Sequence, residues 1–189
     1  GVQVSDTVNC NLNACFYTHT GNSWNPIVTD NCGVSNVSYV LSGATTGNGV
    51  TLNNVVFNIG TTYVNWLVTD SSGNQQNCSF TIIVEDNQNP IIVGCPTSFS
   101  VSAENGLCGA NVNWQVPNVI DNCGASLSGT FNPGQYFNVG QHTINYTSQD
   151  ASGNASSCGF TISVIDNQVP VISLPEDISS CNPVVNFPN

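Results

Sequence analysis

The strongest constraint in this sequence is a repeated segment. Residues 67–90 read LVTDSSGNQQNCSFTIIVEDNQNP and residues 147–170 read TSQDASGNASSCGFTISVIDNQVP, with 13 of 24 positions identical at a constant offset of 80. Repetition at a fixed period means that each repeat forms one structural unit. A period of 80 residues is too long for one turn of a solenoid and fits a small β domain. The sequence therefore predicts a tandem array of modules.

We predict two modules and the start of a third. The first covers residues 1–86, begins inside its N-terminal strand and carries 11 extra residues between Cys32 and Phe57, placed in the Gly-, Thr- and Asn-rich segment 42–54. The second is complete and covers residues 87–166. Residues 167–189 begin a third module that stops in its middle, so we expect the natural chain to continue at both ends.

Alternating apolar and polar residues predict β-strands throughout. Val64, Trp66 and Val68 alternate with polar residues in the first module, as Ile144 and Tyr146 do in the second. Period-2 alternation, broken by turn residues about every ten positions, is typical of a β-sandwich. No segment has helical periodicity. The predicted fold class is all-β, with tandem β-sandwich domains stapled by disulfides.

The chain contains no lysine or arginine. Charged residues make up 6% of the sequence, all of them Asp or Glu, and the formal charge is -11. Nucleic acid is excluded as a partner because phosphate binding needs basic side chains. Binding to anionic lipid through basic residues is excluded for the same reason, and no apolar run is long enough to predict membrane insertion. Trypsin-like proteases find no cleavage site, which suits a protease-resistant extracellular surface.

Nine cysteines in modules of this size predict structural disulfides and an oxidising compartment, so we expect an extracellular protein, secreted or on the cell surface. Four cysteines allow three pairings in each module. In each module we favour one disulfide that closes a local loop near the Asp-Asn-Cys-Gly turn and a second disulfide that joins the first strand to the last. The expected pairs are Cys10–Cys78, Cys15–Cys32, Cys95–Cys158 and Cys108–Cys123, with Cys181 bonded to a residue beyond 189.

Several motifs together resemble the HYR (hyalin repeat) family. They are a Cys-Pro entry, Asp-Asn-Cys-Gly, Phe-x-x-Gly at 137–140, and Asp-x-x-Gly-Asn followed by Cys-x-Phe-Thr-x-x-Val-x-Asp. The resemblance covers both complete modules. It implies immunoglobulin-like sandwiches in tandem and a role in adhesion or spacing. The four-cysteine form is similar to repeats of large secreted surface adhesins of Bacteroidota, including those moved by gliding machinery.

Six aspartates recur in register between the modules, and two interpretations of them stay open. Carboxylates with neighbouring Asn oxygens are ligands that calcium prefers, so these clusters could hold calcium. The predicted fold requires no cofactor, and calcium is the one candidate. Alternatively, each Asp forms a turn by accepting hydrogen bonds from its own backbone, with Gly153 supplying a positive φ. The candidate residues are Asp30, Asp70, Asp86, Asp121, Asp150 and Asp166.

Other sequence features carry less chemistry. No phosphate loop or hydrolase motif occurs, and His142 is replaced by Thr62 in the other copy, so we predict no enzymatic activity. Trp24, Trp66 and Trp114 are expected in the cores, whereas Tyr17, Tyr39 and Tyr136 are expected at the surface. Four Asn-x-Ser/Thr sequons are candidate glycosylation sites: Asn36, Asn77, Asn145 and Asn154.

The sequence thus predicts a structural and adhesive repeat segment of a long extracellular surface protein or filament, acting as a semi-rigid stalk. Pro after each linker favours extended backbone before it. The expected partners are neighbouring modules of the same chain, surface glycans and other copies of the chain. Two alternatives stay open: an accessory glycan-binding module of a secreted enzyme, and a self-assembling fibre subunit that uses unpaired strand edges.

Overall fold

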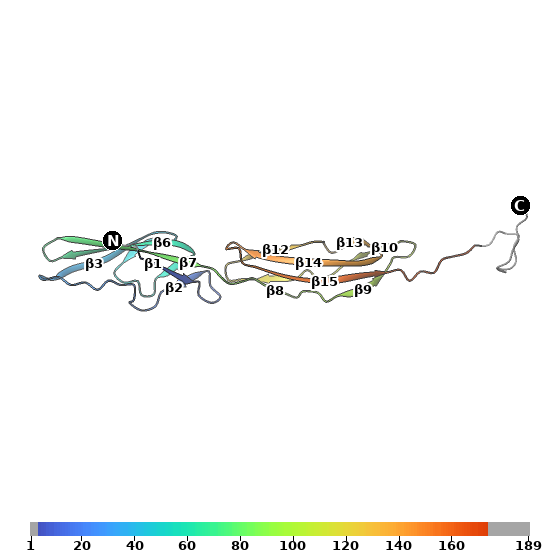
Figure 1. The fold of residues 1–189 in the computed structure, drawn as a ribbon, viewed down its shortest axis with the longest axis horizontal. Coiled ribbons are helices and arrows are strands. Elements are labelled where there is room, and N and C mark those ends of the chain that lie inside the picture. The colour runs from blue at the N-terminus through green and yellow to red at the C-terminus, as the bar shows by residue number, and fades with distance from the viewer. Residues whose placement is uncertain (1–3, 174–189) are drawn as a thin grey trace, which may run out of the picture.

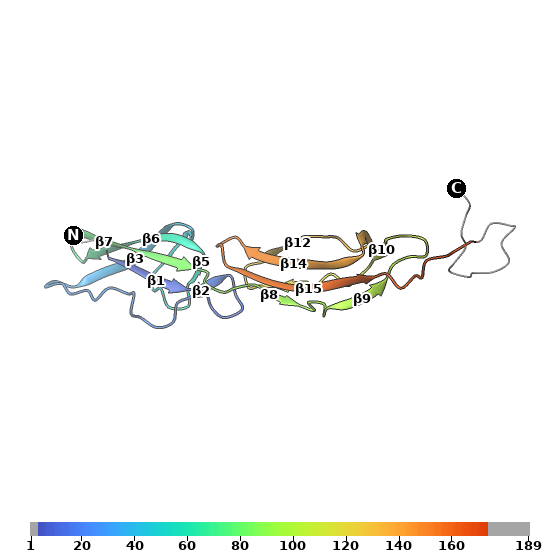
Figure 2. The ribbon, with the colours of Figure 1, turned by 45° about the vertical axis from the view of Figure 1, so that its right-hand side comes forward.

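The computed structural model describes residues 4–173 and is built of β-strands and connecting loops. The strands form two modules that lie end to end along the long axis of the molecule (Figures 1 and 2). The predicted all-β tandem sandwich is confirmed. Among the described residues, no helix is long and apolar enough to cross a membrane. Residues 167–173 of the predicted third module form no strand, and its remainder lies outside the described residues.

The first module consists of a five-stranded sheet and a two-stranded sheet. The large sheet has the order β1-β7-β6-β3-β4, and the small sheet pairs β2 with β5. The first strand, β1, runs parallel to β7, and the other pairs are antiparallel. The strands are β1 (Ser5–Asn9), β2 (Phe16–Thr18), β3 (Val34–Gly43), β4 (Gly47–Gly49), β5 (Val56–Asn58), β6 (Gly60–Asp70) and β7 (Gln75–Glu85).

The second module repeats this plan. Its large sheet has the order β12-β14-β15-β9, with β9 parallel to β15, and two small sheets pair β10 with β13 and β11 with β8. The strands are β8 (Ile91–Val93), β9 (Phe99–Ser102), β10 (Gly109–Val112), β11 (Asn118–Ile120), β12 (Ala125–Gly129), β13 (Gln135–Asn138), β14 (Gly140–Asp150) and β15 (Ala155–Ile165).

The alternating strands place one apolar face inside each module. Val64 and Trp66 on β6 are 0% and 1% exposed, and Ile144 and Tyr146 on β14 are 0% and 3% exposed. Burying one such side chain contributes roughly 1.5–3 kcal/mol, so the paired strands β6–β7 and β14–β15 carry much of each core. Tyr39 was expected at the surface and is instead buried, 5.2 Å from the Trp66 ring.

A hairpin present only in the first module adds to its large sheet. In the second module, β12 ends at Gly129, which pairs with Tyr146. The matching position, Tyr39, pairs with Trp66, but β3 continues to Gly43 and turns back as β4. This extension lies between Cys32 and Phe57, where the first module is 11 residues longer than the second.

The 11-residue strands β6 and β14 run the length of their modules and define two ends. We call the end at Asp70 or Asp150 the N-terminal pole, since it also holds the Asp-Asn-Cys-Gly turn. We call the opposite end, at Gly60 or Gly140, the C-terminal pole. The C-terminal pole of the first module meets the N-terminal pole of the second, and we call this contact the junction (Figure 1).

Candidate functional site

A disulfide between the modules crosses the junction. Cys15, in the loop at the C-terminal pole of the first module, is bonded to Cys123 in the Asp-Asn-Cys-Gly turn of the second, with 4.7 Å between their Cα atoms. This pairing contradicts two predictions, Cys15–Cys32 and Cys108–Cys123. Within residues 4–173, Cys32 and Cys108 are exposed and form no disulfide.

The length of the strands explains the correction. In the second module Cys108 accepts a hydrogen bond from the Val139 amide beside the start of β14, whereas Cys123 precedes a strand that pairs with Asp150 at the end of β14. Ten steps along a strand span roughly 33 Å. The Cα atoms of a disulfide lie within about 7 Å of each other. The two cysteines at opposite poles of one module therefore cannot meet, but those at facing poles of consecutive modules can.

The strand register also decides the remaining pairs. Cys95 and Cys158 are bonded as predicted, because β9 runs parallel to β15 and brings these positions level. The predicted Cys10–Cys78 bond is wrong. The Cys10 amide donates to the Glu85 carbonyl at the far end of β7, seven residues or roughly 23 Å along the strand from Cys78. Cys181 lies outside the described residues.

All six predicted aspartates form turns. In each case Oδ1 accepts a hydrogen bond from a backbone amide two or four residues later, as in the bonds to Oδ1 of Asp86 from Gln88 (3.1 Å) and of Asp166 from Gln168 (2.9 Å). Gly153 has a φ of 93°, as the turn interpretation requires. The corresponding donors to Asp30, Asp70, Asp121 and Asp150 are the amides of Cys32, Ser72 with Asn74, Cys123 and Asn154.

Three of the six aspartates meet at the junction. One carboxylate oxygen from each of Asp86, Asp121 and Asp150 lies within 4.8 Å of the other two. Asp86 follows β7 of the first module, whereas Asp121 and Asp150 come from the second. Asp86 is 4% exposed, and its Oδ2 is buried without a hydrogen-bond partner, as is Oδ2 of Asp121. The sequence singled out these residues, but as members of separate clusters.

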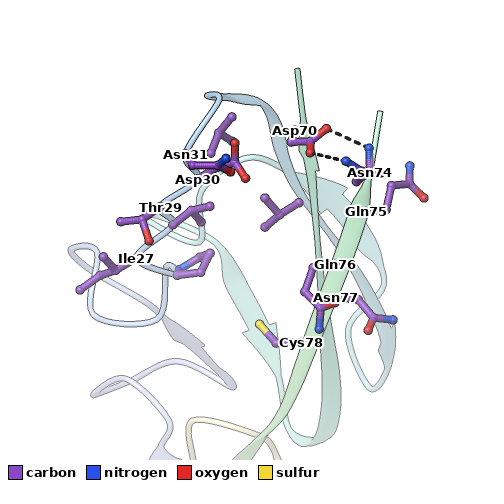
Figure 3. Close-up of a pocket in the computed structure, with 14 residues that line it drawn as sticks. Ile27, Thr29, Asp30, Asn31, Asp70, Asn74, Gln75, Gln76, Asn77 and Cys78 are labelled. Atoms are coloured by element: carbon purple, nitrogen blue, oxygen red, sulfur yellow. Dashed lines mark hydrogen bonds between the residues drawn. The ribbon is translucent and has the colours of Figure 1, made fainter. Parts of the chain in front are cut away.

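The other three aspartates stand at the outer ends of the modules. Asp30 and Asp70 line an open pocket at the N-terminal pole of the first module (Figure 3). Asp166 is exposed after β15 at the other end of the described chain. Asp30 and Asp70 occupy the positions that Asp121 and Asp150 occupy in the second module.

Two asparagine side chains connect the modules beside the acidic group. The Asn122 amide donates to the Asp86 Oδ1 at 3.1 Å and to the Ala14 carbonyl at 3.2 Å. The Asn154 amide donates to the Asp86 carbonyl at 2.8 Å and to Oδ2 of Asp150 at 2.7 Å. Sequence reasoning missed both roles, although Asn122 belongs to the repeated Asp-Asn-Cys-Gly turn.

The junction concentrates negative charge. Two carboxylates about 4 to 5 Å apart repel by roughly 3 to 4 kcal/mol at an effective dielectric constant of about 20. Burial raises the pKa of Asp150, but hydrogen bonds from the Asn154 side chain and from the Asn154, Gly153 and Ser152 amides outweigh it and hold that pKa below its ordinary value. No lysine or arginine exists in the chain to offset this charge.

A buried thiol, Cys10, adjoins the same group. Its Sγ lies within 4.8 Å of both Cys123 Sγ and a carboxylate oxygen of Asp86. Burial, and then repulsion from the Asp86 charge, raise the pKa of the Cys10 thiol. The thiolate is the form that attacks disulfides, so the raised pKa protects the Cys15–Cys123 bond from exchange with its neighbour.

The predicted glycosylation sites differ in accessibility. Asn36, Asn77 and Asn145 are exposed on strands, and their modification stays a prediction. The Asn154 side chain is half-buried and donates two hydrogen bonds at the junction. A glycan on the Asn154 nitrogen would remove one of those hydrogens and occupy space between the modules.

Fold and junction together define an array of β-sandwich modules joined head to tail by a disulfide and a short linker. Residues 7–84 and residues 85–164 each match the HYR domain family. The chain therefore belongs to the HYR family, as the sequence motifs predicted.

Similar proteins include hyalin and proteins with sushi domains. The chain is 37% identical over 157 residues to hyalin of Lytechinus variegatus, covering 79% of this chain and 28% of hyalin. It is 41% identical over 96 residues to sushi, von Willebrand factor type A, EGF and pentraxin domain-containing protein 1 of Rattus norvegicus, covering 49% of this chain and 3% of that protein. It is 31% identical over 91 residues to sushi repeat-containing protein SRPX2 of Homo sapiens, covering 46% of this chain and 20% of that protein.

The chain thus spans less than a third of each of these relatives. They are extracellular or secreted proteins related to adhesion, which confirms the predicted localisation. Among solved structures, the fibronectin(III)-like modules of Clostridium thermocellum CbhA share 13% identity at a TM-score of 0.31, covering 93% of this chain and 97% of that one, a likeness that supports no further argument.

Proposed function

We propose that this chain is a stalk segment of a long extracellular adhesive protein, in which consecutive HYR modules are locked head to tail. The observation that carries the proposal is the Cys15–Cys123 disulfide between modules. The Cys95–Cys158 disulfide lies inside the second module and can stabilise only that module. A covalent bond between modules instead limits their relative rotation, which is the property a stalk requires. The proposal assigns no catalytic role.

The linker and its hydrogen bonds act with the disulfide. The amides of Asn122 and Asn154 reach across the junction to the Ala14 and Asp86 carbonyls. Pro90, which closes the linker, is buried. In the chain-entropy model, a disulfide closing a loop of about 100 residues stabilises by about 4.7 kcal/mol, and here the sequence separation is 108. The junction therefore favours one relative orientation of the two modules.

The outer poles carry the complementary halves of the same junction. Cys108 is the positional equivalent of Cys15, because the linker binds both loops alike: Gln88 Nε2 donates to the Asn11 carbonyl and Gln168 Nε2 to the Glu104 carbonyl. Cys32 is the equivalent of Cys123, since both amides donate to the aspartate two residues earlier. Cys32 and Cys108 are exposed at opposite ends. Further modules joined there would repeat the observed junction and extend the rod.

Small-angle scattering of the oxidised 189-residue chain tests the proposal. The Cys15→Ser variant should show a broader distribution of interatomic distances, because the modules can then hinge about the linker. The Cys108→Ser variant is the matched control, since it removes the exposed positional equivalent of Cys15, which forms no disulfide within the described residues. An unchanged narrow distribution in Cys15→Ser would contradict a rod held rigid by this bond.

End-to-end joining of separate chains is a second candidate, favoured by the exposed cysteines at the two poles. Under mild oxidation at high concentration, a fibre subunit would form a ladder of disulfide-linked multimers. Either Cys32→Ser or Cys108→Ser should abolish that ladder, whereas Cys78→Ser should not. A wild-type chain that stays monomeric would favour one long polypeptide over a polymer of short ones.

A further inference from the structure

We propose that a calcium ion binds at the junction, held by the carboxylates of Asp86, Asp121 and Asp150. The site would exist only where two modules meet, because one ligand comes from the first module and two from the second. The inference rests on the geometry and burial of these residues, and it would hold whether the array serves as a stalk or as a fibre.

The spacing of the carboxylates suits a single calcium ion. Calcium binds oxygen at 2.3–2.6 Å, so two ligand oxygens on opposite sides of one ion lie at most about 5 Å apart. One oxygen from each of the three carboxylates lies within 4.8 Å of the others. One ion can therefore contact all three, with water or backbone carbonyls completing the coordination.

Unpartnered oxygens inside the site give independent support. Asp86 is 4% exposed, and its Oδ1 accepts hydrogen bonds from the Gln88 amide and the Asn122 side chain. Its Oδ2 is buried with no partner, and so is Oδ2 of Asp121. Buried charged oxygens are normally paired or bound to a metal ion, because an uncompensated buried charge is strongly unfavourable. The turn bonds thus use one oxygen of each of these two carboxylates and leave the other for a ligand.

The chain itself cannot supply the counter-charge. It contains no lysine or arginine, and its two histidines lie elsewhere. His19 stacks on Trp24 inside the first module, with 3.8 Å between ring centroids, and His142 Nε2 lies 2.8 Å from the Asn138 carbonyl at the far pole of the second. A cation from solution is the remaining source of positive charge.

The ligand types select a hard cation. Carboxylate oxygens suit calcium, whereas zinc and copper prefer sites with imidazole or thiolate. Among the described residues, the Sγ atoms of Cys10 and Cys123 lie within 4.8 Å of a carboxylate oxygen of Asp86. Cys123 is bonded to Cys15, and a disulfide sulfur is not a thiolate. Magnesium demands near-ideal octahedral geometry at shorter distances and usually keeps several waters. We therefore expect calcium to bind more tightly than magnesium.

Calorimetric titration of CaCl2 into the oxidised, EDTA-treated chain tests the site. We expect one calcium per chain, with affinity reduced at least tenfold in both Asp86→Asn and Asp121→Asn. The matched controls are Asp166→Asn and Asp30→Asn, which neutralise the equivalent aspartates outside the junction and should bind as the wild type does. Near-UV circular dichroism of each variant verifies the fold, and a magnesium titration should show weaker binding.

Three results would overturn the inference. One is the absence of calcium binding up to about 10 mM, a concentration above the dissociation constants of the weakest extracellular calcium-binding modules. Another is an equal loss in all four variants, which would indicate general charge attraction. A third is unchanged affinity in the Asp86→Asn, Asp121→Asn double variant. Small-angle scattering distinguishes this test from the test of the stalk proposal. A chain that stays rigid without calcium would support the stalk proposal even if no calcium binds. A chain that hinges but still binds calcium would support the calcium site and contradict the rigid stalk.

Discussion

The junction and the C-terminal pole of the second module are built alike, but only at the junction does a second described module pack against the linker. At both, an Asp-Asn-Gln linker caps its own turn. The side chain of its asparagine donates a hydrogen bond to the end of the strand that runs parallel to the last strand, from Asn87 to Asn9 of β1 and from Asn167 to Ser102 of β9. Yet Asp86 is 4% exposed whereas Asp166 is exposed, and Cys15 is bonded whereas Cys108 forms no disulfide within residues 4–173.

This difference shows what a neighbouring module adds. Each module makes its own linker turn and presents its own cysteine and aspartate without help. Burial of the aspartate, pairing of the cysteine and convergence of three carboxylates occur only when the N-terminal pole of the next module is present. We therefore propose that the contact between modules is the functional unit and that each outer pole carries half of such a contact.

The largest difference between the junction and the outer poles should come from the disulfide between the modules. Replacing Cys123 with Ser removes the bond between modules and should lower the free energy of unfolding by about 3 to 5 kcal/mol, since the constraint on the unfolded chain is lost. Cys32→Ser changes the equivalent, unbonded residue and should have little effect. Denaturant unfolding under non-reducing conditions measures both, and equal effects would mean that the bond contributes nothing specific.

A smaller effect should follow from the bridging asparagine. Asn154→Ala removes two hydrogen bonds, one to the Asp150 carboxylate and one to the Asp86 carbonyl across the junction. Asn74→Ala removes only the matching bond to Asp70, at 2.7 Å (Figure 3). Hydrogen bonds to charged groups contribute about 1.5–3 kcal/mol and neutral ones about 1. Asn154→Ala should therefore destabilise the chain by about 1 kcal/mol more than Asn74→Ala does. Urea unfolding of the two variants measures this difference, and equal losses would contradict a contribution from the bond across the junction.

The smallest effect should come from acidification, which acts inside the first module, away from both ends. His19 is 3% exposed, both of its ring nitrogens lack partners, and burial lowers its pKa, with partial opposition from Asp6. The unfolded state, with a His pKa of about 6.5, takes up a proton that the folded state resists. Stability is therefore full above that pH and falls as pH decreases through it.

We expect stability to decrease between pH 7 and pH 5.5, because the unfolded chain takes up a proton there that the buried His19 ring resists. The His19→Phe variant keeps an aromatic ring against Trp24 and cannot titrate. Thermal unfolding at the two pH values should show a smaller decrease for His19→Phe than for the wild type. An equal decrease would assign the pH dependence to the carboxylates.

Sequence patterns were sufficient for the modules themselves. Alternation placed Val64, Trp66 and Ile144 in the cores, and the Asp-x-x-Gly-Asn spacing predicted turns in which Gly73 and Gly153 have φ of 87° and 93°. These features depend on neighbouring residues along one strand or one turn, so they can be read locally. Tyr39 was misplaced because its strand continues into a hairpin that only the first module has.

The predicted pairs Cys15–Cys32 and Cys108–Cys123 failed for the opposite reason, although Cys95–Cys158 was predicted correctly. Cys108 and Cys123 are 15 residues apart in sequence, but the chain crosses the whole module between them. Proximity in sequence suggested a local loop, whereas the strand lengths place these residues at opposite poles. Likewise, one aspartate in each cluster was too little for a metal site until Asp86, Asp121 and Asp150 were brought together from three segments.

The sequence by itself determined the repeat, the all-β fold, the extracellular character and the set of acidic and cysteine residues, because each follows from composition or short-range periodicity. Only the tertiary structure decided which of those residues meet. Contacts between modules depend on where each strand ends and which pole faces the neighbour, and both are set by packing over distances that no local pattern records.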